Sequence, residues 1–193
     1  MQRAKIVEIE STVDEAEGIR TIFIKDSIDA VPGQFIMAWI PELDEKPFAI
    51  SYLEKNKFGI TVASVGRFSS KLYEMKKGEK IGIRGPYGTG YKLEGKNAVM
   101  VGGGYGTASL TLLAQEALEK GMNVKFIVGA RTKNKLVYVQ RIKKLIGEKN
   151  LIITTDDGSS GRKGMVTDAL SDLLGEADKV HACGPDKMMK AVT

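Results

Sequence analysis

The chain has one cysteine, Cys183, among its 193 residues. A single cysteine excludes an internal disulfide, and it also excludes an all-cysteine zinc or iron–sulfur site within this chain. The chain has only one histidine as well, which argues against a catalytic couple of histidine and cysteine. We therefore expect no metal site and no catalytic protein nucleophile here.

Long apolar runs are absent too. No segment approaches the roughly 20 apolar residues that a membrane-spanning helix needs, and residues 1–7 lack the apolar stretch of a secretory signal. The 29 Lys and Arg residues nearly balance the 24 Asp and Glu residues, and both signs are interspersed in segments such as residues 74–80. This pattern is typical of a solvated surface. We expect a cytoplasmic protein that binds neither membrane nor nucleic acid.

Residues 1–94 have the pattern of an antiparallel β-domain. Short segments rich in β-branched and aromatic residues are separated by Pro, Gly, Asp and Asn. The segments predict strands at Lys5–Ser11, Ile19–Lys25, Gly33–Ile40, Phe48–Leu53, Gly59–Val65 and Lys80–Arg84. A helical turn is predicted at Ser69–Met75. Six short strands at this spacing indicate a small antiparallel β-barrel.

Residues 95–193 alternate between strand and helix patterns instead. Strands are predicted at Ala98–Val101, Asn123–Val128, Leu151–Thr155 and Lys179–Ala182, and helices at Thr107–Lys120, Leu136–Ile146, Met165–Leu174 and from Pro185 onward. This alternation indicates an α/β domain with a parallel sheet and helices on both faces. The last helix reaches Thr193 without a glycine cap, so we expect a truncated C-terminus.

Glycines stand between the first strand and the first helix of this second domain. A turn of this kind lets phosphates approach the backbone and the free N–H groups of the helix N-terminus. The predicted dinucleotide-binding residues of the turn are Gly102, Gly103, Gly104, Gly106 and Thr107. The spacing only approximates the dinucleotide fingerprint, and a tight turn without a ligand is an equal reading of the motif alone.

Three motif regions occur in the order found in ferredoxin–NADP reductases. Lys46–Ser51 stands at the place of the flavin motif Arg-x-Tyr-Ser, Gly66–Leu72 matches Gly-x-x-Ser/Thr-x-x-Leu, and Cys183–Pro185 follows the glycine turn. The chain resembles that superfamily. Within it, Gly85–Tyr91 and Thr155–Gly164 are similar to electron-transfer subunits of NAD-dependent (class B) dihydroorotate dehydrogenases.

The resemblance implies a function in pyrimidine biosynthesis. Members bind FAD and pass electrons between NAD and the FMN of a dihydroorotate dehydrogenase catalytic subunit, the expected partner. They also carry a [2Fe–2S] cluster, whose cysteines lie beyond the Cys-Gly-Pro helix. Because this chain ends at that helix, we expect the cluster only in a C-terminal tail that is absent here.

The resemblance also implies which residues bind FAD. They are Lys46, Pro47, Phe48, Ala49, Ser51, Thr61, Val62, Ala63, Gly66, Phe68, Ser69 and Ser70. The motif is altered, because Lys46 replaces the arginine, Phe48 the tyrosine and Ala49 the serine. Lysine keeps the charge but loses the bidentate fork. Ala49 cannot bond the flavin, and Ser51 is a substitute expected on the same strand face. Phe48 packs either on the flavin or in the barrel core.

Five further positions are assigned to the nicotinamide dinucleotide. Cys183, with Gly184 and Pro185, is expected to pack near the nicotinamide, and Asp156 follows a parallel strand whose end faces the cofactor cleft. Arg131 follows the second strand of the α/β domain, where the 2′-hydroxyl or 2′-phosphate of the dinucleotide ribose is recognised. An acid there favours NAD and an arginine can accommodate NADP, so the choice stays open between NAD and NADP. No catalytic protein group is needed, since hydride passes between the cofactors.

Two other functions remain open. One is another NAD(P)H-dependent flavin reductase subunit, such as the diaphorase subunit of a hydrogenase or a ferredoxin-dependent transhydrogenase. The other is a binding module that has kept the fold but lost the flavin, which the altered motif permits.

Overall fold

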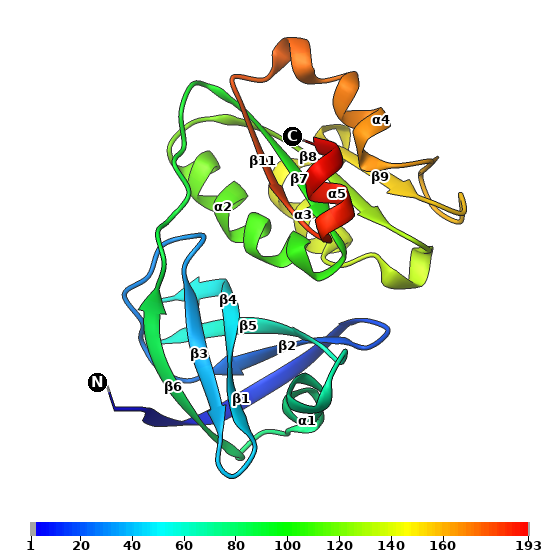
Figure 1. Ribbon diagram of the computed structural model, residues 1–193. Coiled ribbons are helices and arrows are strands. Elements are labelled where there is room, and N and C mark those ends of the chain that lie inside the picture. Colours follow the sequence, from blue (N-terminus) through cyan, green and yellow to red (C-terminus); the bar gives the residue numbers. More distant parts are fainter. Residues whose placement is uncertain (1–2, 193) are drawn as a thin grey trace. The chain divides into compact units, whose positions relative to one another are not determined.

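The computed structural model describes residues 3–192 (Figure 1). The chain divides into two compact units, Met1–Tyr91 and Lys92–Thr193, which are described in turn. Each unit carries one of the two predicted architectures. In the described part of the chain, no helix is both long and apolar enough to cross a membrane.

The first unit is a closed six-stranded antiparallel barrel with the strand order β1-β2-β5-β4-β3-β6. Its strands are β1 (Lys5–Ala16), β2 (Ile19–Ile24), β3 (Phe35–Ile40), β4 (Asp44–Glu54), β5 (Lys57–Ala63) and β6 (Lys80–Tyr87). The predicted barrel is confirmed. Alternating residues of the strands fill its core, such as Ile36 and Ala38 of β3 and Ile60 of β5, all 0% exposed.

Strand β4 departs from the prediction in two ways. It begins at Asp44 and not at Phe48, because its first residues pair with the end of β3 across a tight hairpin, as in Ile40–Asp44. Its pairing with β5 is also shifted between Ile50 and Tyr52, so that one extra residue, Ser51, is inserted there as a bulge.

Helix α1 (Arg67–Glu74) follows β5 and covers part of the barrel. Phe68 and Leu72 lie one turn apart and are both buried, and the ring of Phe68 stacks on Phe48 of β4 with a centroid distance of 6.0 Å. The helix starts two residues before the predicted turn, directly after Gly66.

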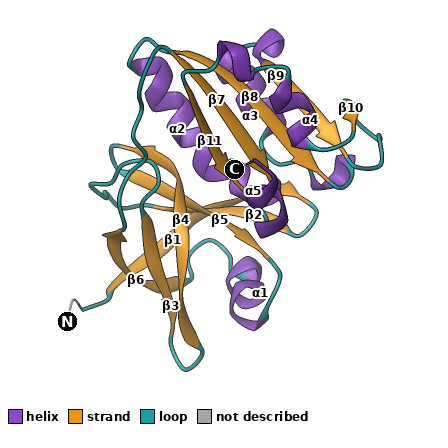
Figure 2. Cartoon of the chain, turned by 45° about the horizontal axis from the view of Figure 1, so that its top comes forward, coloured by secondary structure: helices purple, strands orange, loops and turns teal. Residues whose placement is uncertain are grey.

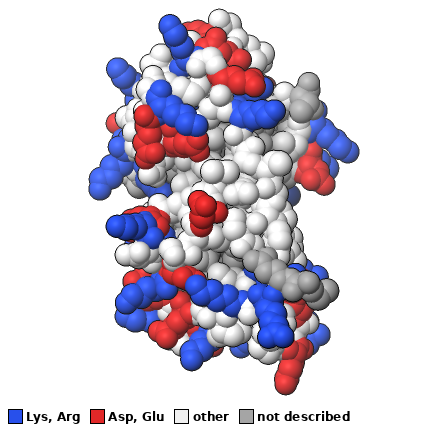
Figure 3. All heavy atoms as spheres, turned by 90° about the vertical axis from the view of Figure 1, so that its left-hand side faces the viewer, with Lys and Arg blue, Asp and Glu red and all other residues white. Residues whose placement is uncertain are grey.

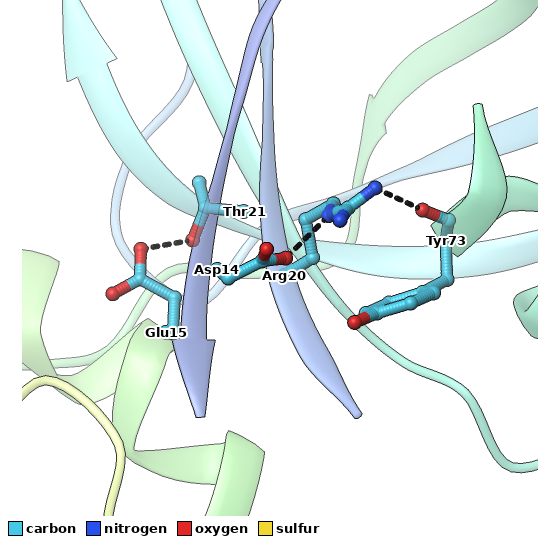
Figure 4. A network of polar contacts seen from close by, with 5 residues as sticks. All are labelled: Asp14, Glu15, Arg20, Thr21 and Tyr73. Atoms are coloured by element: carbon cyan, nitrogen blue, oxygen red, sulfur yellow. Dashed lines mark hydrogen bonds and ion pairs between the residues drawn. The ribbon is translucent and has the colours of Figure 1, made fainter. Parts of the chain in front are cut away.

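A polar network joins the β1–β2 hairpin to the end of α1 (Figure 4). Arg20 donates from Nε to Asp14 at 2.6 Å and from Nη1 to the backbone carbonyl of Tyr73 at 2.8 Å. Its guanidinium also lies 4.5 Å from the centroid of the Tyr73 ring. The neighbouring Thr21 donates to Glu15 at 2.7 Å. Arg20 therefore holds α1 against the barrel.

The second unit contains a parallel five-stranded sheet with the order β10-β9-β8-β7-β11. Its strands are β7 (Asn97–Gly103), β8 (Asn123–Ala130), β9 (Leu151–Thr155), β10 (Arg162–Lys163) and β11 (Lys179–Cys183). Its helices are α2 (Thr107–Glu119), α3 (Val139–Ile146), α4 (Val166–Ser171) and α5 (Asp186–Val192) (Figure 2). This confirms the predicted parallel α/β architecture.

Both faces of the sheet are covered. On one face, Val99, Val101 and Ile127 pack with α4 and α5, whereas Met100 and Phe126, which point to the other face, are also 0% exposed. Strands buried on both sides read as continuous apolar runs, and these runs made β7 and β8 predictable.

Some boundaries in this unit differ from the prediction. Helix α3 begins at Val139 and not at Leu136, because Tyr138 has left-handed backbone (φ 64°) and breaks the helical path. Helix α4 ends at Ser171, three residues before the predicted end. Strand β10 has two residues, too few to give an alternation that sequence can reveal. Figure 3 shows one face of the molecule, on which Lys and Arg lie interspersed with Asp and Glu.

Candidate cofactor-binding sites

A cavity of about 370 Å³ lies in the first unit between the start of β4 and the start of α1. It is lined by Leu43, Asp44, Lys46, Phe48, Val65, Gly66, Arg67, Phe68 and Ser69. Five of these are predicted FAD-binding residues, namely Lys46, Phe48, Gly66, Phe68 and Ser69. The fold thus brings the two flavin-type motifs to one cavity, although about 20 residues of chain separate them.

The side of the cavity formed by α1 is suited to an anion. The Ser69 hydroxyl accepts hydrogen bonds from the N–H groups of Val65 (3.2 Å) and Gly66 (3.1 Å), and it donates to the Gly66 carbonyl at 3.2 Å. This arrangement holds the turn that starts the helix. The first N–H groups of a helix have no acceptor within it, so they are available to an anion.

Two cations and one carboxylate line the same cavity. The ammonium of Lys46 lies 2.6 Å from Asp44, and its hydrogen bond is the main cause that lowers the pKa of the Asp44 carboxyl. Arg67 is exposed, and within residues 3–192 its guanidinium has no hydrogen-bond or ion-pair partner. Sequence reasoning missed Arg67, because the motif Gly-x-x-Ser leaves that position free.

The other residues of the altered flavin motif lie in different environments. Phe48 is half-buried and one face of its ring contacts Phe68, while Pro47 and Ala49 are exposed. Ser51 is 1% exposed, and its hydroxyl bonds Thr61 Oγ1 at 2.8 Å. The prediction that Ser51 substitutes for Ala49 assumed regular alternation, and the bulge at Ser51 removes that basis.

Strand β5 offers backbone groups to a ligand more than side chains. The Val62 side chain is 0% exposed in the barrel core. The ladder between β4 and β5 ends at Ile50–Ile60, so β2 is the sheet neighbour of Thr61–Ala63. The Ala63 carbonyl also accepts a hydrogen bond from the N–H of Val65 at 3.0 Å. Ser70 serves the helix start, since its N–H bonds the Gly66 carbonyl at 2.8 Å and its hydroxyl accepts from Ser64 at 2.9 Å.

In the glycine turn of the second unit, three glycines have no room for a Cβ atom and one, Gly104, has open space around it. A Cβ atom at Gly102 would lie 2.7 Å from Thr107 Oγ1, and one at Gly106 would lie 2.6 Å from the Cys183 carbonyl oxygen. At Gly103 it would meet Met188 at 2.5 Å. Gly104 has φ +54° and nothing within 4 Å of its Cβ position. Open space for a ligand therefore lies at Gly104.

The predicted residues at the end of β11 border this turn. Cys183 pairs with Gly102 in the sheet and is partly exposed, and Pro185 approaches the Cβ position of Gly103 to 3.0 Å. The hydroxyl of Thr107, at the start of α2, is buried and has no hydrogen-bond partner among the described residues. His181 is buried in β11, and burial lowers its pKa.

Arg131 and Asp156 follow adjacent strands at the carboxyl edge of the sheet. The N–H of Asp156 donates to the carbonyl of Ala130, the last residue of β8. Both side chains are exposed, and neither has a partner in the part of the chain that the structure describes. The neighbouring Asp157 is engaged in its own loop, where hydrogen bonds from Ser159 lower the pKa of its carboxyl.

Comparison with known proteins assigns the chain to a family. The family model described as "Oxidoreductase NAD-binding domain" matches residues 100–193. A probable dihydroorotate dehydrogenase B (NAD(+)) electron transfer subunit of Thermococcus kodakarensis is 40% identical over 97% of this chain and 78% of its own length. The corresponding subunit of Methanocaldococcus jannaschii is 40% identical over 100% of this chain and 73% of its own length. The chain belongs to the family of dihydroorotate dehydrogenase B electron transfer subunits.

Solved structures of related reductases share the fold of this chain. A structure of the NADH-dependent reduced ferredoxin-NADP oxidoreductase has a TM-score of 0.86 and 34% identity, over 98% of this chain and 71% of that one. A ferredoxin reductase of carbazole 1,9a-dioxygenase has a TM-score of 0.85 over 98% of this chain and 64% of that one. At 21% identity, the second likeness shows the ferredoxin reductase-like fold alone.

In the described residues, no group of three or more His, Cys, Asp or Glu side chains could hold a metal ion. The first-unit cavity has two cations and one carboxylate, Asp44, beside a helix start, and this surplus of positive charge fits the diphosphate of FAD. The open position at Gly104 fits a dinucleotide in the second unit.

Proposed function

We propose that this chain binds FAD in the first-unit cavity and NAD(H) at the glycine turn. We further propose that these sites serve electron exchange with a dihydroorotate dehydrogenase catalytic subunit, through a [2Fe–2S] cluster that the single cysteine of this chain cannot supply. The observation that carries the proposal is the meeting of Lys46, Phe48, Gly66 and Ser69 around one cavity. A flavin there supplies the exchange between two-electron hydride chemistry and one-electron transfer. Pyrimidine biosynthesis is the process that this partner implies.

In this proposal the residues of the chain bind and orient the cofactors. Lys46 and the helix start at Gly66 hold the FAD diphosphate, and the backbone of Thr61–Ala63 offers hydrogen bonds to the flavin. Phe48, supported from behind by Phe68, presents the rest of its ring to the cavity. No side chain of the chain is assigned a proton or a covalent bond, because hydride transfer between two cofactors needs neither.

Arg131 and Asp156 occupy the region that reads the adenosine ribose. Arginine can accommodate a 2′-phosphate, and a carboxylate can bond a 2′-hydroxyl. Membership of a family named for NAD(+) supports NAD, and a comparison of NADH with NADPH as reductants measures the preference directly.

Flavin titration tests the cofactor half of the proposal. The purified chain, stripped of any bound flavin, is titrated with FAD, and the quenching of flavin fluorescence is followed. NADH is then added without oxygen, and the flavin absorption is expected to bleach. A chain with no affinity for FAD would contradict the proposal and favour the flavin-free binding module.

Reconstitution tests the partner half. The chain is mixed with a dihydroorotate dehydrogenase catalytic subunit from the same organism, and complex formation is measured by size-exclusion chromatography with light scattering. A stable complex is expected. Failure to associate, together with rapid NADH-driven reduction of ferredoxin, would instead favour the transhydrogenase type of reductase.

A further inference from the structure

We propose that Arg67 takes the place of the missing motif arginine and is the guanidinium ligand of the FAD diphosphate. The inference rests on the proposed function, because it concerns the same cavity. It goes beyond that function by assigning the strongest phosphate contact to a residue outside the flavin motif, on α1 and not on β4.

Lys46 is a weak replacement for the motif arginine in this structure. Its ammonium is a point charge and cannot form the two parallel hydrogen bonds of a guanidinium. It also lies 2.6 Å from the Asp44 carboxylate, with which it shares the cavity wall. A diphosphate that binds Lys46 must compete with Asp44, so part of the attraction is lost to that internal pair.

Arg67 meets no such competition. It is the first residue of α1, it lines the same cavity as Lys46, and the first turn of the helix contains no acidic residue. Within residues 3–192 no carboxylate or carbonyl accepts a hydrogen bond from its guanidinium. The group is therefore available for bidentate binding to phosphate, which is the contact that the altered motif has lost.

The position of Arg67 adds to this effect. The residue follows Gly66, whose missing side chain leaves open space at the helix start, since a Cβ there would have nothing within 4 Å. A phosphate beside Gly66 would meet the first N–H groups of α1 and the guanidinium of Arg67 together. Backbone donors fix its place and the guanidinium supplies the charge.

The test compares the affinity of three flavins for matched variants. Dissociation constants of FAD, FMN and riboflavin are measured by fluorescence titration for the wild-type chain, Arg67→Gln, Lys46→Gln and Lys71→Gln. Lys71 is the control, because it is a cation of the same helix, one turn away, that does not line the cavity. Arg67→Lys keeps the positive charge but removes the guanidinium, so it separates the effect of charge from that of bidentate bonding. Circular dichroism of every variant shows whether the fold is retained.

We expect Arg67→Gln to weaken FAD about 10- to 100-fold, as for a charge-assisted bidentate contact. Lys46→Gln should weaken it less, by about threefold, and Lys71→Gln should stay within about twofold of the wild type. Riboflavin has no phosphate, so its affinity should be the same in all variants. The salt dependence of FAD binding should flatten in Arg67→Gln, and Arg67→Lys should regain part of the affinity.

Three results overturn the inference in distinguishable ways. If the wild type binds FAD and Arg67→Gln binds it equally well, the assignment of Arg67 is wrong while the proposed function stands. An equal loss for riboflavin and FAD would also reject the phosphate contact. If the wild type binds none of the three flavins, the proposed function itself fails, and the inference fails with it.

Discussion

At the residue scale, the glycines of the turn between β7 and α2 are required for different structural reasons. Gly102, Gly103 and Gly106 lack side chains because neighbouring atoms lie within 3 Å of their Cβ positions. Gly104 has open space instead, so its missing side chain serves a ligand or the backbone conformation alone. A substitution at Gly104 can therefore test dinucleotide binding without breaking the packing of the turn.

Gly104→Val should block reduction of the bound flavin by NADH while FAD affinity stays unchanged. The branched side chain would occupy the space where phosphate approaches the backbone. Gly121→Val is the matched control, because Gly121 also has positive φ (+77°) and nothing within 4 Å, so it shares the backbone strain. Stopped-flow bleaching of the flavin measures the rate, and normal reduction in Gly104→Val would refute the site.

His181 should make the chain less stable in mild acid. Burial is the main cause that lowers its pKa from the ordinary value of 6.5, and the charge of Lys179 acts in the same direction. Below that value the unfolded chain takes up a proton that the folded chain resists, so stability falls as the pH drops through about 6.5. Tm measured between about pH 8 and pH 5 should decline less in His181→Gln than in the wild type. Parallel curves for the two proteins would show that another group controls the acid response.

At the element scale, α1 and β4 together line the first-unit cavity, so the contacts that position α1 also shape this cavity. The apolar side of the helix, Phe68 and Leu72, packs on the barrel. Its far end is held by the bond from Arg20 to the carbonyl of Tyr73 (Figure 4). This contact lies at Tyr73, about one turn beyond Ser69, which is the last residue of α1 that lines the cavity.

Arg20→Ala should lower the free energy of unfolding by about 1–2 kcal/mol, because a partly buried carbonyl loses a charged donor. FAD affinity should fall only a few-fold, since α1 keeps its apolar contacts. Urea denaturation measures the first quantity and fluorescence titration the second. Lys71→Gln removes a cation of α1 that has no such bond and should leave both unchanged, whereas an equal effect of the two variants would show that Arg20 is no special anchor.

At the scale of the whole molecule, the chain has two units with separate tasks under the proposed function. In that proposal the barrel binds FAD and the parallel sheet binds the nicotinamide dinucleotide. Cys183, its one cysteine, belongs to strand β11 of the second unit, and a [2Fe–2S] cluster needs four ligands. Electron delivery through such a cluster would therefore require cysteines from outside these 193 residues.

The purified 193-residue chain should reduce small dyes with NADH but contain no stoichiometric iron. It should also fail to couple dihydroorotate oxidation to NAD reduction when mixed with the catalytic subunit alone. Elemental analysis and a coupled assay check the two statements, and dye reduction serves as the internal control for a competent flavin site. Bound iron, or coupled turnover with this chain as it stands, would show that the exit route of the electrons has been misread.

The sequence by itself determined the two architectures and the order of the motifs. Strand alternation in residues 5–84 and continuous apolar runs such as Ala98–Val101 can each be recognised within a single segment. A strand with one buried face alternates between apolar and polar residues, and a strand with two buried faces is apolar throughout. The glycine turn could be located for the same reason, since a strand, a turn and a helix follow one another along the chain. Element boundaries were less accurate, as in α3, where the left-handed Tyr138 gave no signal.

Only the tertiary structure decided which residues meet. Arg67 and Lys46 line one cavity because β4 and α1 fold together, and no spacing rule connects positions 46 and 67. The bulge at Ser51 depends on its pairing with β5, and the separate roles of Gly104 and Gly106 depend on where Cys183 of β11 lies. These features arise from contacts between segments distant in sequence, whose register and approach are set by packing and not by local residue preference.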